Sequence, residues 1–364
     1  MADAAWFLPV AGVAAGIVIG AVARNVHFCT LSALERHWYA NDSSGLRTWV
    51  LFAAVAIALT QAMSLAGAID VGPSFYLTPE FSWAGAILGG IAFGFGMALV
   101  GTCGFGALVR LGGGSLRSLV ALIILGLAAL ATQRGLLALA RTRIVDETAI
   151  DLGFAGNQSL GGLISALAGF DARAVTALAV VAVLMAWVFS DRCYRTNYRS
   201  IGAALAMGGV IAGGWLATSW ASGHSLYPVQ LEAGSFVVPV GDVLFHLATF
   251  TGALPDYGVG LVIGVPLGAA AVAFRRHDVR WEACDDAREL GRHIGGAALM
   301  GIGGVLAMGC TVGQGVTAAS VLAISAPLVM VSIGVGARLG LAYLVEGSAW
   351  AAFRLPAQEP AKQG

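Results

Sequence analysis

The feature that most constrains the fold is the length of the stretches without a charged side chain. The 45 residues between Arg292 and Arg338 contain no Lys, Arg, Asp or Glu, and neither do the 29 residues between Glu80 and Arg110. A membrane-spanning helix needs about 20 apolar residues, and in lipid its backbone polar groups must be satisfied within the segment. The sequence therefore predicts an all-α, polytopic integral membrane protein.

The apolar runs accommodate about nine transmembrane helices. The N-terminus contains Asp3 and no basic residue, unlike a secretory signal peptide, so we expect the first helix to be retained. A net charge of zero gives no indication of a nucleic-acid partner. The predicted spans are residues 6–23, 49–68, 82–100, 118–138, 174–190, 201–220, 257–274, 294–309 and 326–345.

The basic residues orient these spans, because cytoplasmic loops of membrane proteins are enriched in Lys and Arg. With the loop 24–47 in the cytoplasm, 15 of the 20 basic residues lie inside, four lie outside and Arg338 lies within the last span. We therefore predict an inner-membrane protein with its N-terminus outside and its C-terminus in the cytoplasm. The polar segment 275–292 is then expected to form a cytoplasmic amphipathic helix. The predicted inside set is Arg24, Arg36, Arg47, Arg110, Arg117, Arg192, Arg195, Arg199, Arg275, Arg276, Arg280, Arg288, Arg292, Arg354 and Lys362, and the outside set is Arg134, Arg141, Arg143 and Arg173.

Two cysteines lie in similar segments that are 207 residues apart. Without a gap, Cys103 aligns with Cys310, and several glycines before and after them also coincide. The predicted topology brings the helix before Cys103 in from outside and the helix before Cys310 in from inside. This is the arrangement of an inverted repeat, in which broken helices meet at a central site. We predict one membrane domain, residues 1–364, with pseudo-symmetric halves at 1–150 and 171–350.

Glycines on both sides of these cysteines allow each helix to open. An opened helix exposes backbone N–H groups and a positive dipole end to an anion, and such backbone is tolerated at membrane depth only beside protein or a water-filled cavity. The supporting glycines are Gly101, Gly104, Gly106, Gly309, Gly313 and Gly315.

A third cysteine, Cys29, follows the first span. Gly260-x-x-x-Gly264 in the seventh span echoes Gly16-x-x-x-Gly20 in the first, but Ala273 falls where Cys29 would. The five cysteines have no CxxC spacing, and the histidines have no metal-ligand spacing, so we expect no disulfide, metal or cofactor. Cys193 and Cys284 lie in polar segments and receive no role.

Three motifs resemble the YeeE/YedE family of thiosulfate transporters. They are Arg24-x-x-x-Phe28-Cys29, then Gly89-Gly90-x-x-Phe93-Gly94-x-Gly96 followed by Gly101-Thr102-Cys103-Gly104, and finally Gly309-Cys310-Thr311-x-Gly313-Gln314-Gly315. The resemblance implies an hourglass-shaped helical bundle in which Cys29, Cys103 and Cys310 line the narrow path. It also implies thiosulfate or a related sulfur anion as substrate, and a TusA-like sulfur carrier or a sulfur-responsive regulator as cytoplasmic partner.

Thiols suit such a substrate. A thiol is a weak donor with a polarizable sulfur, and burial in apolar surroundings keeps it neutral. Weak, transient contacts with the terminal sulfur of thiosulfate would allow each site to release what it binds. Arg338, a charge within an apolar span, could complement the anion or could extend to the inner surface as a snorkelling residue.

The predicted function is transport of thiosulfate or a related small sulfur anion, and not catalysis. One alternative is a membrane sensor that signals to a soluble regulator through the segment 275–292. Another is an intramembrane thiol enzyme with Cys29 as its nucleophile, but no activating base accompanies Cys103 or Cys310 in the sequence.

Overall fold

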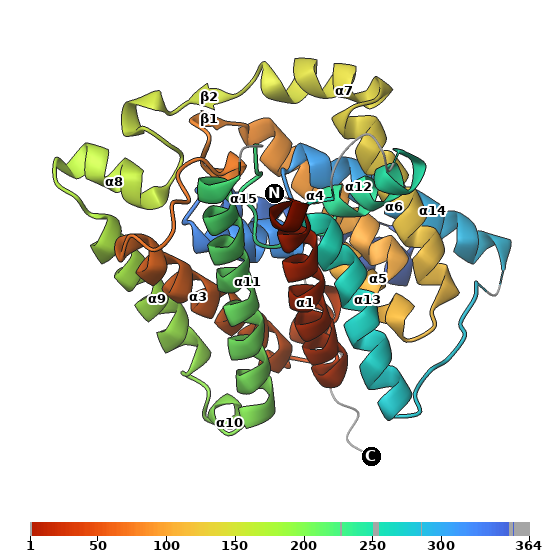
Figure 1. The fold of residues 1–364 in the computed structure, drawn as a ribbon. Coiled ribbons are helices and arrows are strands. Elements are labelled where there is room, and N and C mark those ends of the chain that lie inside the picture. The colour runs from red at the N-terminus through yellow and green to blue at the C-terminus, as the bar shows by residue number, and fades with distance from the viewer. Residues whose placement is uncertain (1, 226–227, 250–254, 285, 349–351, 353–364) are drawn as a thin grey trace.

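The computed structural model describes residues 2–225, 228–249, 255–284, 286–348 and 352. The described residues form a bundle of helices with one short two-stranded sheet (Figure 1), which confirms the predicted all-α membrane fold. Arg354 and Lys362, which belong to the predicted inside set, lie outside the described residues. The first helices are α1 (Ala2–Val26), α2 (Thr30–Tyr39), α3 (Ser44–Leu65), α4 (Trp83–Val100), α5 (Gly104–Gly112) and α6 (Leu116–Gln133).

The middle of the chain forms shorter elements, and the second half returns to long helices. The strands β1 (Glu80–Phe81) and β2 (Ile150–Asp151) pair antiparallel, with Glu80 opposite Asp151. The middle helices are α7 (Leu136–Arg141), α8 (Leu160–Ala168), α9 (Arg173–Val188) and α10 (Arg192–Arg195). The later helices are α11 (Tyr198–His224), α12 (Val238–Thr249), α13 (Tyr257–Arg275), α14 (Ala287–Leu306) and α15 (Ser325–Glu346), and a π-helical turn, Gly313–Ala318, precedes α15.

Seven helical segments of the described chain are long and apolar enough to cross a membrane. Two of the nine predicted spans are not among them. The span 174–190 corresponds to α9, which has 16 residues, and the span 294–309 corresponds to α14, which begins with charged turns that contain Arg288, Glu289 and Arg292. The seven segments are Trp6–Tyr39, Ser44–Leu65, Trp83–Gly112, Leu116–Gln133, Tyr198–His224, Tyr257–Arg275 and Ser325–Glu346.

Glycines allow α1 and α13 to pack with their backbones in contact. A methyl group on Gly16 would lie 2.4 Å from the carbonyl oxygen of Leu261, and one on Gly264 would lie 2.3 Å from that of Val13. Small residues at such spacing are typical of close helix pairs in membranes. The similar Gly16–Gly20 and Gly260–Gly264 segments are therefore the two partners of one helix interface.

The two halves of the chain are interleaved. Helix α1 packs on α13 and α3 packs on α11, while α4 contacts both α14 and α15, and α6 contacts α14. At the contact between α4 and α14, a methyl group on Gly96 would lie 2.4 Å from the carbonyl oxygen of Gly296, and one on Gly303 would lie 2.5 Å from that of Gly89. The segments before the two aligned cysteines therefore lie side by side in the core.

The loops between helices gather at two ends of the bundle. One end, called here the basic end, contains residues 24–47, 110–117, 190–199 and the described part of 276–292. At this end Arg47 Nη1 donates to the Val188 carbonyl at 2.9 Å, and Arg199 Nη2 donates to the Asn25 carbonyl at 2.6 Å. The opposite loop end contains the described parts of 66–82, 134–172 and 225–256. The loops that the charge pattern assigns to one side are thus together at one end.

The segment 275–292 does not form the predicted separate amphipathic helix: Arg275 ends α13, residues 287–292 begin α14, and the described residues 276–284 and 286 between them are not helical. The Asp286 side chain accepts a hydrogen bond from Glu289 N at 2.6 Å and so caps α14. The backbone of residues 276–284 instead bonds to the turn after α5, because Arg280 N donates to the Gly113 carbonyl at 3.0 Å and Leu116 N to the Glu282 carbonyl at 2.8 Å. These backbone bonds replace those that a helix would have made.

Candidate functional site

Cys103 lies in a break between α4 and α5. Helix α4 ends at Gly101, whose φ of +77° is in the left-handed region that favours glycine. Cys103 then caps α5, and its Sγ accepts a hydrogen bond from Gly106 N at 3.4 Å. A methyl group on Gly106 would lie 2.2 Å from Thr102 Oγ1. The backbone conformation at Gly101 and the lack of space at Gly106 therefore explain why glycine occupies both positions.

Cys310 lies in an equivalent break after α14. Met308 and Gly309 have φ values of +55° and +157°, and Cys310 Sγ accepts from Gly313 N at 3.3 Å. At both breaks the thiol sulfur thus accepts the N–H of the residue three positions later. Because an accepted N–H uses a sulfur lone pair, the S–H hydrogen of each cysteine stays available for donation to a ligand.

Cys29 follows a third break, between α1 and α2. It is the residue before α2, with extended backbone at φ −150°, and it is half-buried. The residue two positions before it, His27, has φ +54°, just as Gly101 and Met308 have positive φ two positions before their cysteines. All three predicted path cysteines therefore begin a new helical segment after a left-handed residue.

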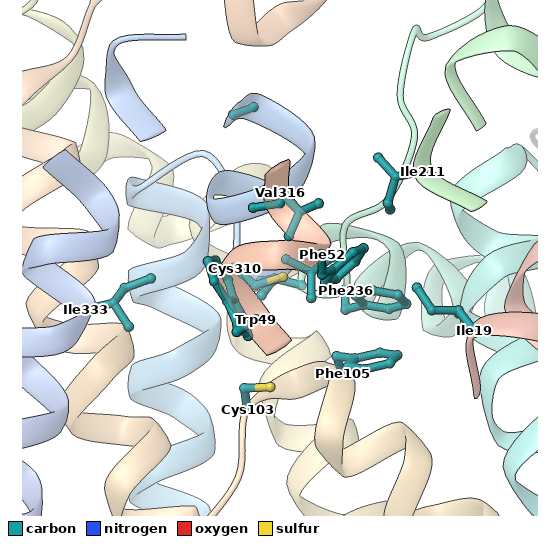
Figure 2. Packing of buried hydrophobic residues seen from close by; sticks show 14 of the residues in the cluster. Ile19, Trp49, Phe52, Cys103, Phe105, Ile211, Phe236, Cys310, Val316 and Ile333 are labelled. Atoms are coloured by element: carbon teal, nitrogen blue, oxygen red, sulfur yellow. The ribbon is translucent and has the colours of Figure 1, made fainter. Parts of the chain in front are cut away.

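The structure brings these three cysteines together in the core. Cys103 and Cys310 belong to one buried cluster and Cys29 packs against it, and Cys103 lies beside the hydroxyl of Thr311. Both Cys103 and Cys310 are almost fully buried, and Figure 2 shows Phe52, Phe105 and Phe236 on the same side of the two thiols. The rings of Phe105 and Phe236 have centroids 4.9 Å apart. Apolar side chains thus enclose the thiols.

Hydroxyl groups around Cys310 add polarity that the sequence analysis missed. Thr311 Oγ1 lies beside the Cys103 thiol and the Tyr76 hydroxyl lies beside Ser235. Both hydroxyls are buried, and neither forms a hydrogen bond of good geometry with a described residue. Tyr76 lies close to Cys310 and Ser235, and a methyl group on Gly313 would lie 3.1 Å from Ser235 Oγ and 3.3 Å from the Tyr76 hydroxyl. Buried polar groups are normally paired, so these hydroxyls are candidates for contact with the oxygens of an anion.

Two further side chains satisfy the carbonyls that the broken helices leave open. Arg110 Nη2 donates to the Gly101 carbonyl at 2.9 Å. Gln314 Nε2 donates to the carbonyl of Ala307 at 2.8 Å and to that of Met308 at 3.3 Å. The last carbonyls of a helix need such partners when they are buried. Gln314 belongs to a motif noted in the sequence, but its spacing did not indicate this capping role.

No described contact joins the three path cysteines to Arg338, Cys193 or Cys284. The Arg338 guanidinium lies over the rings of Trp38 and Tyr39, 5.5 and 5.1 Å from their centroids. These are cation–π contacts, and the buried Nη1 of Arg338 has no hydrogen-bond partner among the described residues. Cys193 is exposed and Cys284 is half-buried.

One group of side chains in the described residues has the composition of a metal site. Cys284, Glu289 and His293 offer ligand atoms within 4.8 Å of one another at the basic end. The four-residue spacing of Glu289 and His293 places both side chains on one face of α14. This spacing could have indicated the group in the sequence, where only spacings among histidines and among cysteines were considered. Glu289 also pairs with Arg117 at 3.4 Å.

Comparison with known proteins identifies the family of the chain. A model of the sulphur transport family matches residues 26–339. The chain is 27% identical over 326 residues to the thiosulfate transporter TsuA of Spirochaeta thermophila, covering 86% of this chain and 92% of that protein. It is 23% identical over 330 residues to the thiosulfate transporter TsuA of Escherichia coli, covering 84% and 85%. The family prediction made from the cysteine motifs is confirmed: the chain belongs to the sulphur transport (YeeE/YedE) family.

Proposed function

We propose that this multi-pass membrane protein transports thiosulfate or a related small sulfur-containing anion along a path lined by Cys29, Cys103 and Cys310. The observation that carries the proposal is the pair of buried thiols at matched helix breaks. Each sulfur accepts a backbone N–H, at 3.4 Å for Cys103 and 3.3 Å for Cys310. Each thiol can therefore offer its hydrogen to the soft terminal sulfur of the substrate.

The groups around Cys310 supply contacts for the other end of such an anion. Hydroxyls of Thr311, Tyr76 and Ser235 would donate to sulfonate oxygens, while the thiol meets the terminal sulfur. No carboxylate or guanidinium of the described residues bonds to these hydroxyls or to the Cys103 and Cys310 thiols. Weak neutral donors favour release as well as binding, which suits transport.

The interleaved halves support the proposed mechanism of access. We infer an inverted repeat in which α1, α3, α4 and α6 correspond to α11, α13, α14 and α15, because α1 packs on α13 as α11 packs on α3. Small relative movements of the two halves would then open the path alternately to each end. In the proposed orientation, the basic end lies on the cytoplasmic side of the inner membrane.

The sensor alternative is less well supported, because the described residues 276–284 are not helical and their backbone bonds to residues 113–117. We also infer transport rather than catalysis, from the family of the chain and the names of its relatives. A TusA-like carrier or a regulator at the basic end remains a prediction from the family resemblance.

Uptake by proteoliposomes tests the proposal. Purified protein should take up labelled thiosulfate saturably, and excess unlabelled thiosulfate should compete. Cys103→Ala and Cys310→Ala should each reduce initial uptake at least tenfold, whereas Cys193→Ala should match wild type. Absence of uptake by folded, inserted wild type would contradict transport, and normal uptake by both alanine variants would contradict the thiol path.

A further inference from the structure

A polar cavity of about 420 Å³ lies at the basic end of the bundle. It is called the arginine pocket here. Four guanidinium groups and two carboxylates line it, which leaves two positive charges in excess, and one if Glu289, which also pairs with Arg117, is counted. Its charged lining residues are Arg24, Arg110, Arg117, Asp278, Arg280 and Glu282.

The arginines of this pocket are unequally neutralised. Arg24 Nη2 is 2.9 Å from Asp278 Oδ2, and Arg117 Nη2 is 2.7 Å from Glu282 Oε2. Arg280 shares Asp278, with its Nε 3.5 Å from Oδ1. Arg110 pairs with no carboxylate of the described residues, and its bond is to the neutral Gly101 carbonyl. The pocket therefore retains positive charge around Arg110.

The pocket adjoins two of the three cysteine breaks. His27, the left-handed residue before Cys29, lines it. Arg110 bonds at 2.9 Å to Gly101, the left-handed residue before Cys103. An anion that leaves either thiol toward the basic end would thus meet the pocket next.

The carboxylates of the pocket are carried by a strap, residues 278–282, that lies across the turn after α5. Its backbone is fixed there, because Arg280 N bonds to the Gly113 carbonyl at 3.0 Å and Glu282 N to the Gly114 carbonyl at 3.3 Å. Guanidinium groups bind carboxylates and other oxyanions with the same planar fork. An oxyanion in the pocket would therefore compete with Asp278 and Glu282 for the same donors.

We propose that the arginine pocket is a second anion-binding site, which takes the oxyanion group of a divalent sulfur oxyanion after it leaves the cysteines. Its place on the path rests on the proposed function, but its chemistry does not. The pocket recognises charge and oxygen geometry, so sulfate should bind there as well as thiosulfate. Asp278 is the internal competitor that keeps the site weak enough to release its ligand.

Binding of sulfate to the purified full-length protein at low ionic strength, measured by calorimetry, tests the pocket independently of transport. Arg110→Gln should weaken binding at least tenfold. Arg280→Gln, at a largely exposed side chain, should weaken it two- to fivefold. Asp278→Asn should tighten it severalfold, because it frees Arg24 and Arg280. A purely structural role for Asp278 would not produce this gain. Added salt should weaken wild-type binding.

One control tests whether the effect belongs to this pocket. Arg173→Gln removes a guanidinium at the loop end, where Arg173 pairs with Asp171 at 4.0 Å, and should leave sulfate binding unchanged. Wild-type sulfate affinity in both Arg110→Gln and Arg280→Gln, or weaker binding in folded Asp278→Asn, would overturn the pocket even if thiosulfate uptake is normal. If the sulfate affinities of the variants follow the predicted pattern but the protein does not transport thiosulfate, the anion site in the pocket is supported and the proposed transport function is refuted.

Discussion

Replacement of Gly106 by alanine should disturb the Cys103 break in a way that a second substitution can relieve. The added methyl group would lie 2.2 Å from Thr102 Oγ1 but 3.6 Å from Thr102 Cβ. Both residues are buried, and Gly106 N also donates to Cys103 Sγ. Gly106→Ala must therefore shift either the hydroxyl or the first turn of α5, and the thiol would shift with it.

The size of the effect follows from the two distances. Overpacking a core costs about 1–3 kcal/mol, while alanine in a helix gains up to about 1 kcal/mol over glycine, so a net loss of about 1–2 kcal/mol is expected. Thr102→Ala removes the 2.2 Å contact and leaves an ordinary one at 3.6 Å. The double variant should recover most of the loss, which corresponds to an interaction energy of about 1–2 kcal/mol between neighbouring sites.

The assay is a double-mutant cycle with two measurements on each protein. Unfolding of the purified protein in detergent gives the stability, and initial thiosulfate uptake in proteoliposomes gives the function. Gly106→Ala should transport at least tenfold more slowly than wild type, and the double variant should approach Thr102→Ala. Gly295→Ala is the control, since its methyl group would meet nothing within 4 Å. Wild-type behaviour of Gly106→Ala, or no rescue by Thr102→Ala, would refute the reasoning.

Three further predictions concern other parts of the molecule. Gln314→Ala should destabilise the protein by roughly 2–4 kcal/mol, because it leaves one buried and one partly buried carbonyl without their donor; unfolding in detergent measures this, and a loss below about 0.5 kcal/mol would contradict the capping role. Burial, and then the Asp256 carboxylate, hold the pKa of the Glu232 carboxyl well above its ordinary value. The folded protein therefore keeps a proton that the unfolded chain releases, so its stability falls as pH rises above the ordinary glutamate pKa. The stability of Glu232→Gln relative to wild type should therefore rise as pH increases above the ordinary glutamate pKa, and a pH-independent difference would contradict this. A membrane-impermeant thiol reagent should label Cys284 from the cytoplasmic side alone, and labelling from outside would contradict the proposed orientation.

The membrane fold and the positions of the two main breaks could be predicted because their signals are local in the sequence. Long uncharged runs require membrane helices, and glycines on both sides of Cys103 and Cys310 mark where those helices open. The structure shows why two of these glycines are needed: Gly101 has positive φ, and Gly106 has no room for a methyl group.

Other parts could not be predicted because they depend on partners far away in the chain. The segment 276–286 has the composition of a polar helix, but its backbone finds partners at residues 113–116, more than 160 positions earlier. Nothing in the sequence around Tyr76 and Ser235 indicates a functional role, because only the folded chain brings these residues close to Cys310. Arg110 could be interpreted as a topological signal, and its bond to Gly101 is evident only in three dimensions.

The chemistry of the thiol can be measured directly at Cys310. Serine is nearly isosteric with cysteine and is a stronger donor, but it lacks the polarizable sulfur. Thiosulfate and sulfate uptake should be compared for wild type, Cys310→Ser and Cys310→Ala at matched density in proteoliposomes. If the S–H group conducts the soft sulfur of thiosulfate, thiosulfate uptake in the serine variant should fall close to that of the alanine variant. Full thiosulfate uptake by Cys310→Ser would contradict the thiol mechanism and assign binding to the backbone N–H groups and hydroxyls around the break.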